Sequence, residues 1–338
     1  MKRRNIMLGS AAAAALTNSY SVNPDHWERL SKVVRNSNGI GETAVAALES
    51  ETAALKNLHT GISSAQLFPH IDTHLGHLAD ILNRPMPPSM RQRLITTTGR
   101  IASLGGWVAW DNGYPQAAHR LYRISIKASH EAGDPSVLAA CLLNMSYMPS
   151  SGGNNLEAER MLGQGMEQMT PSSSPLIATW LEASRAEVVA RRDDQAALPL
   201  LEKSFHRFST ITPNVGTSES TPITPARMDS FALNVNLHLG RHSDAEPIAR
   251  RLLGATSPSS PLHPISLSDV ATVYLKTGNF EEGTEIASKA LSAAVNAQSR
   301  WAMSRLNNLY ALLSERAAKD QRAAEITNQF KEYSNNSY

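Results

Sequence analysis

The residues closest to a metal-binding pattern are three histidines in one segment. His70, His74 and His77 are spaced at i, i+4 and i+7, with Asp72 among them, so a helix would carry three imidazoles along one face. Pro69 places His70 in the first turn of that helix, and the chain has no His-Glu-x-x-His element. We therefore expect solvent-facing or pH-sensitive histidines in this segment, and no metal site.

The chain offers no pattern that supports catalysis. Glu49 and Glu51 are two positions apart and diverge on a helix, and the glutamates at 281–282 flank a turn, so neither pair forms an acid/base site. No Gly-x-Ser-x-Gly elbow, phosphate-binding loop or Rossmann fingerprint occurs; the Gly-Gln-Gly at 163–165 lacks the rest of that motif. We expect a binding protein without a cofactor rather than an enzyme.

Cys141 is the only cysteine of the chain. A single cysteine excludes an intramolecular disulfide, and it excludes zinc or iron–sulfur sites that need several thiolates. Because Cys141 lies in the apolar run from 137 to 145, we expect a small buried hydrophobic residue rather than a reactive thiol.

Aromatic and arginine residues give a more specific indication of binding. The candidate ligand-binding residues are Trp107, Trp110, Tyr114, Tyr122, Tyr147, Trp180, Arg100, Arg123 and Arg185. They fall on three consecutive predicted helical hairpins, and in stacked hairpins the first helices line the concave surface. The rings would form an apolar wall for a peptide or small ligand, and the arginines would receive a carboxylate. Alternatively, any one of these rings fills a gap between hairpins as ordinary core.

The elements that must position these residues are helices. Apolar residues recur at helical spacing in nearly every window after residue 25, and alternating strand patterns are scarce. Turns follow at 113, 153, 193, 240 and 278: four are glycines followed five residues later by Ala or Gly, and Asp193 with Leu198 is a weaker copy. This is the tetratricopeptide pattern, with steps of 38 to 47 residues instead of about 34.

Composition narrows the classes of protein. The 338 residues are 41% hydrophobic, and 32 Lys+Arg against 30 Asp+Glu leave a formal charge of +2. A free-standing nucleic-acid-binding protein is disfavoured, because such proteins concentrate positive charge. No segment reaches the roughly 18 uninterrupted apolar residues that a membrane-spanning helix needs. We expect no direct nucleic-acid partner and no membrane partner.

The stretch from 93 to 113, RLITTTGRIASLGGWVAWDNG, continues through Ala117-Ala118 to Tyr122 and Ala132-Gly133-Asp134. It resembles the tetratricopeptide C-terminal region of actinobacterial regulators that carry an Xre-type helix-turn-helix domain. The resemblance covers most of residues 2–315 and is most specific over 91–134. It implies a cytoplasmic sensor of transcriptional or signalling control. The helix-turn-helix domain is not in this chain, and Thr224 to Arg227 stands where that family tends to have an aromatic-acidic cluster.

The N-terminal segment, residues 1–24, permits two interpretations. Arg3-Arg4 and the alanines at 11–15 outline a twin-arginine export signal, although Lys2 replaces the usual Ser/Thr. The resemblance instead implies a linker or first helix of a cytoplasmic protein, and we expect the latter.

The sequence thus predicts an all-α, right-handed superhelix of tetratricopeptide-like hairpins over residues 25–333. About five hairpins are recognisable, with helical segments before them and a closing helix from Trp301 to Tyr333. The expected function is ligand or peptide sensing that acts through a partner, with a peptide, small molecule or regulatory protein in the concave groove and a possible homodimer. The alternatives are an exported binding protein and a biosynthetic enzyme recruited from a regulator scaffold.

Overall fold

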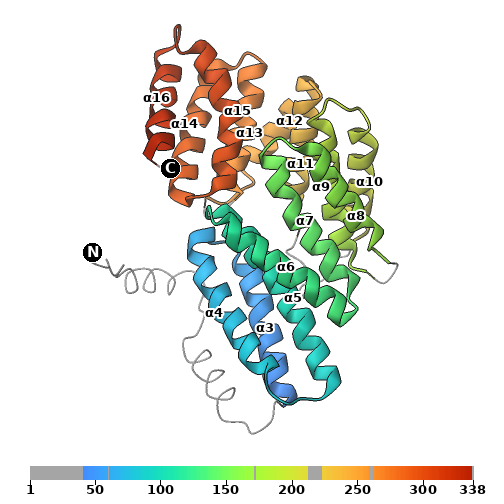
Figure 1. Ribbon diagram of the computed structural model, residues 1–338. Coiled ribbons are helices and arrows are strands. Elements are labelled where there is room, and N and C mark those ends of the chain that lie inside the picture. Colours follow the sequence, from blue (N-terminus) through green and yellow to red (C-terminus); the bar gives the residue numbers. More distant parts are fainter. Residues whose placement is uncertain are drawn as a thin grey trace, which may run out of the picture.

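The computed structural model describes residues 41–59, 61–170, 173–211, 223–258, 260 and 262–336. The described residues form fourteen helices and no strand, so this part of the protein is all-α (Figure 1). The interpretations of residues 1–24, and of most of the Ser/Thr/Pro-rich stretch at 209–225, lie outside the described residues.

Consecutive helices pack in pairs along the chain. The pairs are α3 (Glu42–Leu58) with α4 (Ser64–Leu82), α5 (Pro88–Asp111) with α6 (Pro115–Ala132), α7 (Pro135–Ser151) with α8 (Asn155–Glu167), α9 (Pro175–Ala190) with α10 (Ala197–Thr210), α11 (Pro225–His238) with α12 (His242–Leu253), α13 (His263–Lys276) with α14 (Phe280–Ala297), and α15 (Arg300–Arg316) with α16 (Gln321–Asn336). The first helices also contact one another, for example α5 with α7 and α7 with α9.

All five predicted turns are confirmed. Gly113, Gly153, Gly240 and Gly278 have φ angles of 81°, 82°, 68° and 89°, and each joins the two helices of a pair. Asp193 occupies the same place between α9 and α10 with φ 56°. The left-handed conformation ends the first helix and reverses the chain, which is why glycine is favoured there.

Small residues just after these turns let the paired helices approach each other. Ala118, Ala158 and Ala245 are completely buried, and Gly283 is buried as well. In the α9–α10 pair the small buried residue is Ala197 rather than the predicted Leu198, because α10 begins late, at Ala197. Pro199 lies in the first turn of α10, where a helix tolerates proline.

Two predicted boundaries are wrong. The closing helix is two helices, α15 and α16, with a short turn at 317–320. Helix α4 starts at Ser64 rather than at Pro69, because Ser63 and Gln66 form a capping box at its N-terminus. Pro69 therefore lies inside α4, two positions beyond its first turn, and His70 is not at a helix start.

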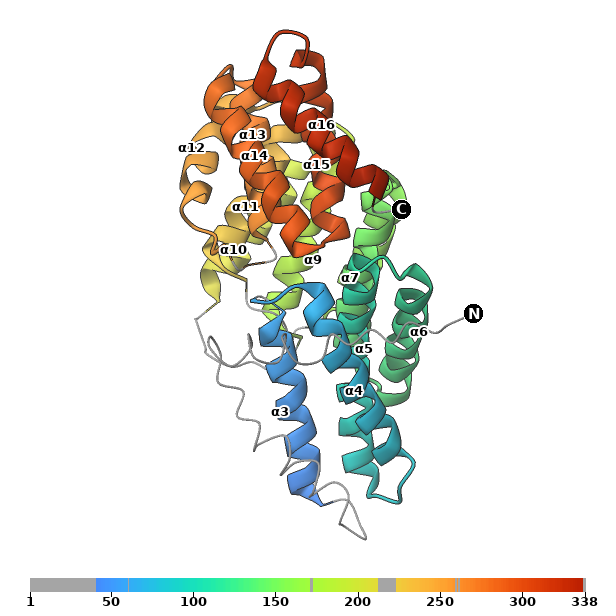
Figure 2. The ribbon, with the colours of Figure 1, turned by 90° about the vertical axis from the view of Figure 1, so that its left-hand side faces the viewer.

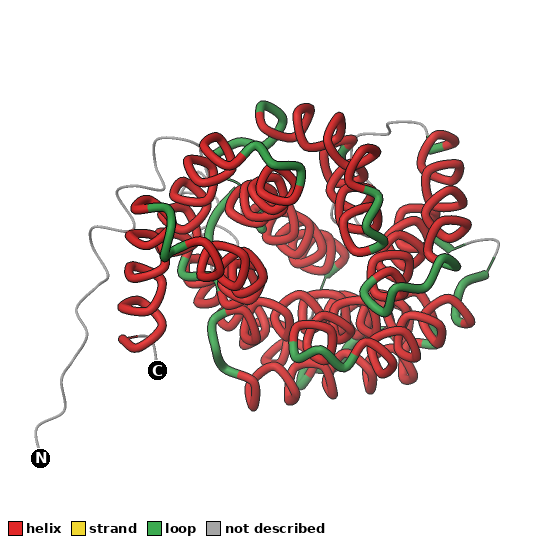
Figure 3. Tube along the Cα trace, turned by 90° about the horizontal axis from the view of Figure 1, so that it is seen from above, coloured by secondary structure: helices red, strands yellow, loops and turns green. Residues whose placement is uncertain are grey.

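The hydrophobic core joins the two ends of the described chain. One cluster of buried residues contains side chains of α3, α4 and α5 together with side chains of α13, α14, α15 and α16. Helix α15 also contacts α5 directly. Figures 2 and 3 show the helix pairs following a curve that brings the C-terminal pairs next to the N-terminal ones.

Candidate functional site

A pocket of about 350 Å³ opens on the side of the protein formed by the first helices of the pairs. Its walls come from the C-terminal end of α3, from α5, α7, α9, α11 and α15, and from five residues between α12 and α13: Ala255, Thr256, Ser257, Ser260 and Leu262. Residues from position 56 to position 301 thus meet around one space. A volume in the range of about 300 to 1,000 Å³ is typical of small-molecule sites.

Four aromatic side chains form much of the wall. Trp107 packs edge-on against Trp301, with ring centroids 5.9 Å apart, and Tyr147 packs against the same Trp301 at 5.3 Å. Trp180 stands on α9 and meets Phe231 edge-on at 5.8 Å. Such edge-to-face contacts fix the orientation of each ring, so the wall has a defined shape before any ligand enters.

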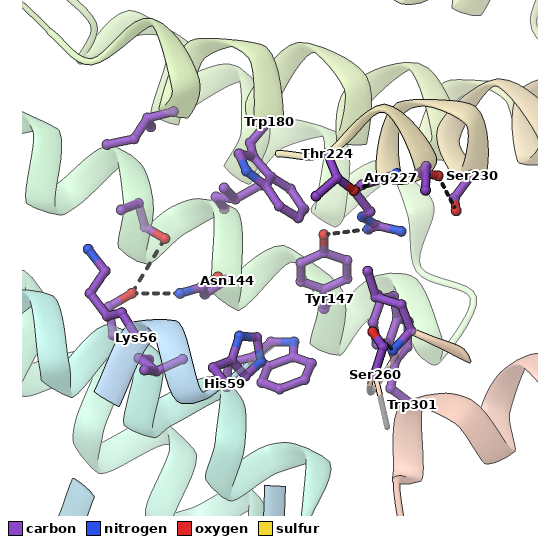
Figure 4. Close-up of a pocket in the computed structure, with 18 of the residues that line it drawn as sticks. Lys56, His59, Asn144, Tyr147, Trp180, Thr224, Arg227, Ser230, Ser260 and Trp301 are labelled. Atoms are coloured by element: carbon purple, nitrogen blue, oxygen red, sulfur yellow. Dashed lines mark hydrogen bonds between the residues drawn. The ribbon is translucent and has the colours of Figure 1, made fainter. Parts of the chain in front are cut away.

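Arg227 is the most unusual residue of the pocket. Its side chain is 3% exposed, and its guanidinium carbon lies 4.1 Å from the ring centroid of Phe231, 5.1 Å from Trp180 and 5.5 Å from Trp301. One terminal nitrogen donates to the hydroxyl of Tyr147 at 3.3 Å, as Figure 4 shows. The positive charge is thus stabilised by cation–π contacts and by one hydrogen bond to a neutral oxygen.

Two further cationic residues line the pocket, and none of its lining residues in the described part of the chain is acidic. Lys56, on α3, is 8% exposed, and Arg100 on α5 lies 3.5 Å from Asp134, which is not a lining residue. Figure 4 shows Lys56 and Arg227 on opposite sides of the space. The pocket is therefore electrostatically suited to an anion.

His59 contributes a neutral polar group. It follows the last residue of α3 and packs edge-on against Trp107, with ring centroids 4.6 Å apart. Both ring nitrogens are enclosed and have no hydrogen-bond partner among the described residues. Burial lowers the pKa of His59 to about 4, because the protonated imidazole loses its hydration. At neutral pH the ring offers one donor and one acceptor to a ligand.

A short hydrogen-bonded chain supports the floor. The Asn144 side-chain amide donates to the Ser103 hydroxyl at 3.0 Å, and the Ser103 hydroxyl donates to the backbone carbonyl of Ala140 at 3.4 Å. The buried Tyr122 hydroxyl donates to the backbone carbonyl of Asn144 at 3.1 Å. This chain fixes α5, α6 and α7 relative to one another beneath the pocket.

A second, more polar pocket of about 300 Å³ lies beyond Tyr147 and Trp301, which line both spaces. Glu187 on its wall pairs with Arg191 at 2.6 Å and with Arg305, and all three carry little exposed surface. Burial alone would raise the pKa of Glu187, but the charges of Arg305, Arg191 and Arg227 hold it below its ordinary value. This buried network ties α9 to α15.

The structure brings four of the nine predicted site residues into the aromatic pocket: Arg100, Trp107, Tyr147 and Trp180. The other five predicted residues do not line it. Trp110 and Tyr122 are 4% and 1% exposed and belong to the core, Tyr114 is 56% exposed beside Phe68, Arg123 is exposed on α6, and Arg185 pairs with Glu159. Trp110 follows Trp107 by three positions, yet only Trp107 lines the pocket.

The pocket residues that the sequence did not predict include its charged and aromatic members Lys56, His59, Arg227 and Trp301. A usable signal existed for two of them. The first-helix rule that selected Tyr147 and Trp180 also applies to Arg227 on α11 and to Trp301 on α15. Nothing in the local sequence marks Lys56 and His59, which reach the pocket only because α3 packs beside α5.

The predicted histidine face is only partly right. His70 is exposed, but His74 is fully buried, with its ring nitrogens 2.7 Å from the Thr52 hydroxyl and 3.0 Å from a Glu51 carboxylate oxygen. The three rings are therefore not a common solvent-facing row. Within the described ranges no group of three potential metal ligands comes together.

Cys141 is buried, as predicted, and burial raises the pKa of its thiol to about 12. A thiol of this kind packs as a small apolar group, since the thiolate is the reactive form. None of the helices that the structure describes is both long and apolar enough to cross a bilayer.

Comparison with known proteins adds no relative: no protein-family model matches the chain, and no curated protein matches it in sequence.

Proposed function

We propose that this chain is a tetratricopeptide-type ligand-sensing protein that acts in transcriptional or signalling regulation through a partner. The observation that carries the proposal is the aromatic pocket, whose walls are assembled from α3, α5, α7, α9, α11 and α15. A pocket built from elements so far apart in the chain can report its occupancy to the whole arrangement of helices.

We also propose that the helix pairs form a right-handed superhelix of tetratricopeptide-like hairpins. The repeated helix pairs, the left-handed turn residues and the small residues after them are features of tetratricopeptide-like hairpins, which in a right-handed superhelix place their first helices on the concave side. The pocket is lined mainly by those first helices. A cytoplasmic location is part of the same proposal.

Occupancy would be transmitted through the contact between α5 and α15. Trp107 on α5 and Trp301 on α15 touch each other and both line the pocket. A ligand that binds the two rings in their present positions stabilises the contact between α5 and α15. Without ligand, this contact is less stable. A partner that recognises the joined arrangement would read the presence of ligand.

The test is mass spectrometry of small molecules and peptides retained by the purified protein, followed by thermal unfolding with the compounds identified. The proposal predicts a retained ligand that raises the unfolding temperature and that quenches tryptophan fluorescence. A protein that retains no compound, or whose unfolding temperature responds to none of the compounds it retains, would contradict it. Binding to a promoter fragment by the isolated chain at physiological salt would contradict the role of a partner.

A further inference from the structure

We infer that the aromatic pocket takes an organic anion, whose acidic group pairs with Arg227 and whose flat or apolar body lies against Trp107 and Trp180. This inference deepens the proposed function and rests on it, since it names the chemical class of the sensed ligand.

The first step is the unbalanced charge of Arg227. Among the described residues no carboxylate lies within ion-pair distance of its guanidinium, and its Nε is buried without a partner. Buried arginines normally pair with carboxylates, because an unneutralised charge is costly to remove from water. The Arg227 guanidinium instead makes cation–π contacts with Trp180, Phe231 and Trp301. These contacts offset only part of the cost of burying its charge.

The other buried arginines of the same region provide an internal comparison. Arg305 is 6% exposed and pairs with Glu187, and Arg191 pairs with the same carboxylate at 2.6 Å. Both therefore have their counterion within the chain. Arg227, which is at least as buried, has none at contact distance and differs from them by lining the aromatic pocket. Arg227 acts on Glu187 only through its longer-range field, so a carboxylate in contact with its guanidinium is what a ligand would supply.

The surroundings of Arg227 also favour a negatively charged ligand. The N-terminus of α11 opens onto the pocket through Thr224 and Ala226, and a helix N-terminus attracts negative charge. Lys56 and Arg100 line the pocket too; each has interactions of its own, so they add to the positive potential without being needed as the direct partner.

The rest of the pocket fits an apolar body. From Arg227 the wall continues along Trp180 and Ile177 on α9, and along Leu104 and Trp107 on α5. A flat ring system stacks on such indoles, and an aliphatic chain buries its surface against them. A volume of about 350 Å³ lies at the lower end of the range for ligand pockets, which suits a small molecule rather than a peptide segment of several residues.

The test uses two fluorescent dyes that share one ring system. Anilinonaphthalene sulfonate carries an anionic group, and phenylnaphthylamine is the same molecule without it. The variant Arg227→Gln removes the charge, and Arg123→Gln removes an exposed arginine of α6 as the matched control. A charge-assisted contact in an enclosed site is worth about tenfold to a hundredfold in affinity.

The expected result is that Arg227→Gln weakens binding of the sulfonate dye by that factor and leaves the neutral dye within about twofold. Arg123→Gln should change neither. If Arg227→Gln does not fold, as judged by circular dichroism, Arg227→Lys serves in its place; it keeps the charge but loses the Nε donor, and should show a smaller loss confined to the anionic dye.

Displacement of the neutral dye then separates the possible acids. Naphthoate, naphthyl phosphate and the uncharged naphthalene carboxamide are compared on the unaltered protein. Stronger displacement by either acid than by the amide supports the inference, and the better acid identifies a carboxylate or a phosphate ester as the natural head group.

Two results would overturn the inference. If both dyes bind equally and no change at Arg227 affects either, the pocket takes neutral ligands; the anion assignment fails while the proposed sensing function stands. If neither dye binds the folded protein, the pocket is not a ligand site, and the proposed function fails with the inference.

Discussion

The carboxylate of Asp111, the last residue of α5, accepts a hydrogen bond from the backbone amide of Trp301 at 2.9 Å, across 190 positions of sequence. The same oxygen accepts from the Ser299 hydroxyl at 2.8 Å, and the other oxygen accepts from Ser64 at 2.5 Å. Asp111 thereby fixes the first turn of α15 against α5 and α4. Because Trp301 lines the pocket, this carboxylate positions one pocket wall without touching a ligand.

Replacement of Asp111 by Ala should lower the free energy of unfolding by about 3 kcal/mol, because three buried donors lose their acceptor. Asp111→Asn keeps the shape and one acceptor oxygen and should cost less. Urea unfolding followed by circular dichroism measures both. Equal stability of Asp111→Ala and the unaltered protein would show that the hydrogen bonds to α15 are not what joins the two ends.

The Glu187 carboxylate is predicted to be a second contact that stabilises the packing of distant helices. Glu187→Ala leaves Arg305 and Arg191 buried without the carboxylate that they contact, and should cost about 3 to 5 kcal/mol. The exposed pair of Glu285 and Lys289 is the control: water screens their attraction, so Glu285→Ala should leave the free energy of unfolding almost unchanged. Urea midpoints compare the two variants; a similar loss in both would mean that burial of the network adds nothing.

Close packing of α5 on α6 gives a steric prediction. A Cβ at Gly106 would come within 2.6 Å of the Tyr122 ring, which is fully buried, so Gly106→Ala should destabilise the protein by about 1 to 3 kcal/mol. Gly163 in α8 has no atom near that position, and Gly163→Ala should stabilise by about 0.5 to 1 kcal/mol. Thermal unfolding of the two variants should therefore shift in opposite directions.

Acid sensitivity is predicted from His238, whose pKa is lowered to about 3 by burial and by the nearby charges of Arg191 and Arg305. The unfolded chain binds a proton at His238 near pH 6.5 and the folded protein does not, so this residue costs stability as the pH falls from about 7 to 4. His238→Asn should regain about 2 kcal/mol at pH 4 relative to pH 7. Unfolding free energies at the two pH values measure this difference, with His70→Asn on the exposed face of α4 as the control.

The five left-handed turns could be predicted from the sequence, but the turn between α15 and α16 could not. Four glycines and Asp193 were located because a left-handed residue at the end of a helix is a local requirement, and local requirements leave a trace in the sequence. The split between α15 and α16 was missed because the turn at 317–320 contains no Gly or Pro and reads as continuous helix.

The pocket was harder to predict because it is a tertiary feature. Trp107 and Trp110 have the same residue type on the same helix and both belong to the buried cluster, yet only Trp107 also lines the pocket. Arg227 becomes a pocket residue through its contacts with Trp180, Tyr147 and Trp301, which lie 47, 80 and 74 positions away in sequence. No local pattern contains that information.

The most direct test of the central claim, that the aromatic pocket binds a small ligand, is the stoichiometry of phenylnaphthylamine binding in a variant whose pocket is filled. Ala140→Trp adds an indole on α7 at the lining of the pocket, and Gln116→Trp adds the same indole on the exposed surface of α6. We expect one dye per chain for the unaltered protein and for Gln116→Trp, and loss of binding for a folded Ala140→Trp. Unchanged binding to folded Ala140→Trp would contradict it.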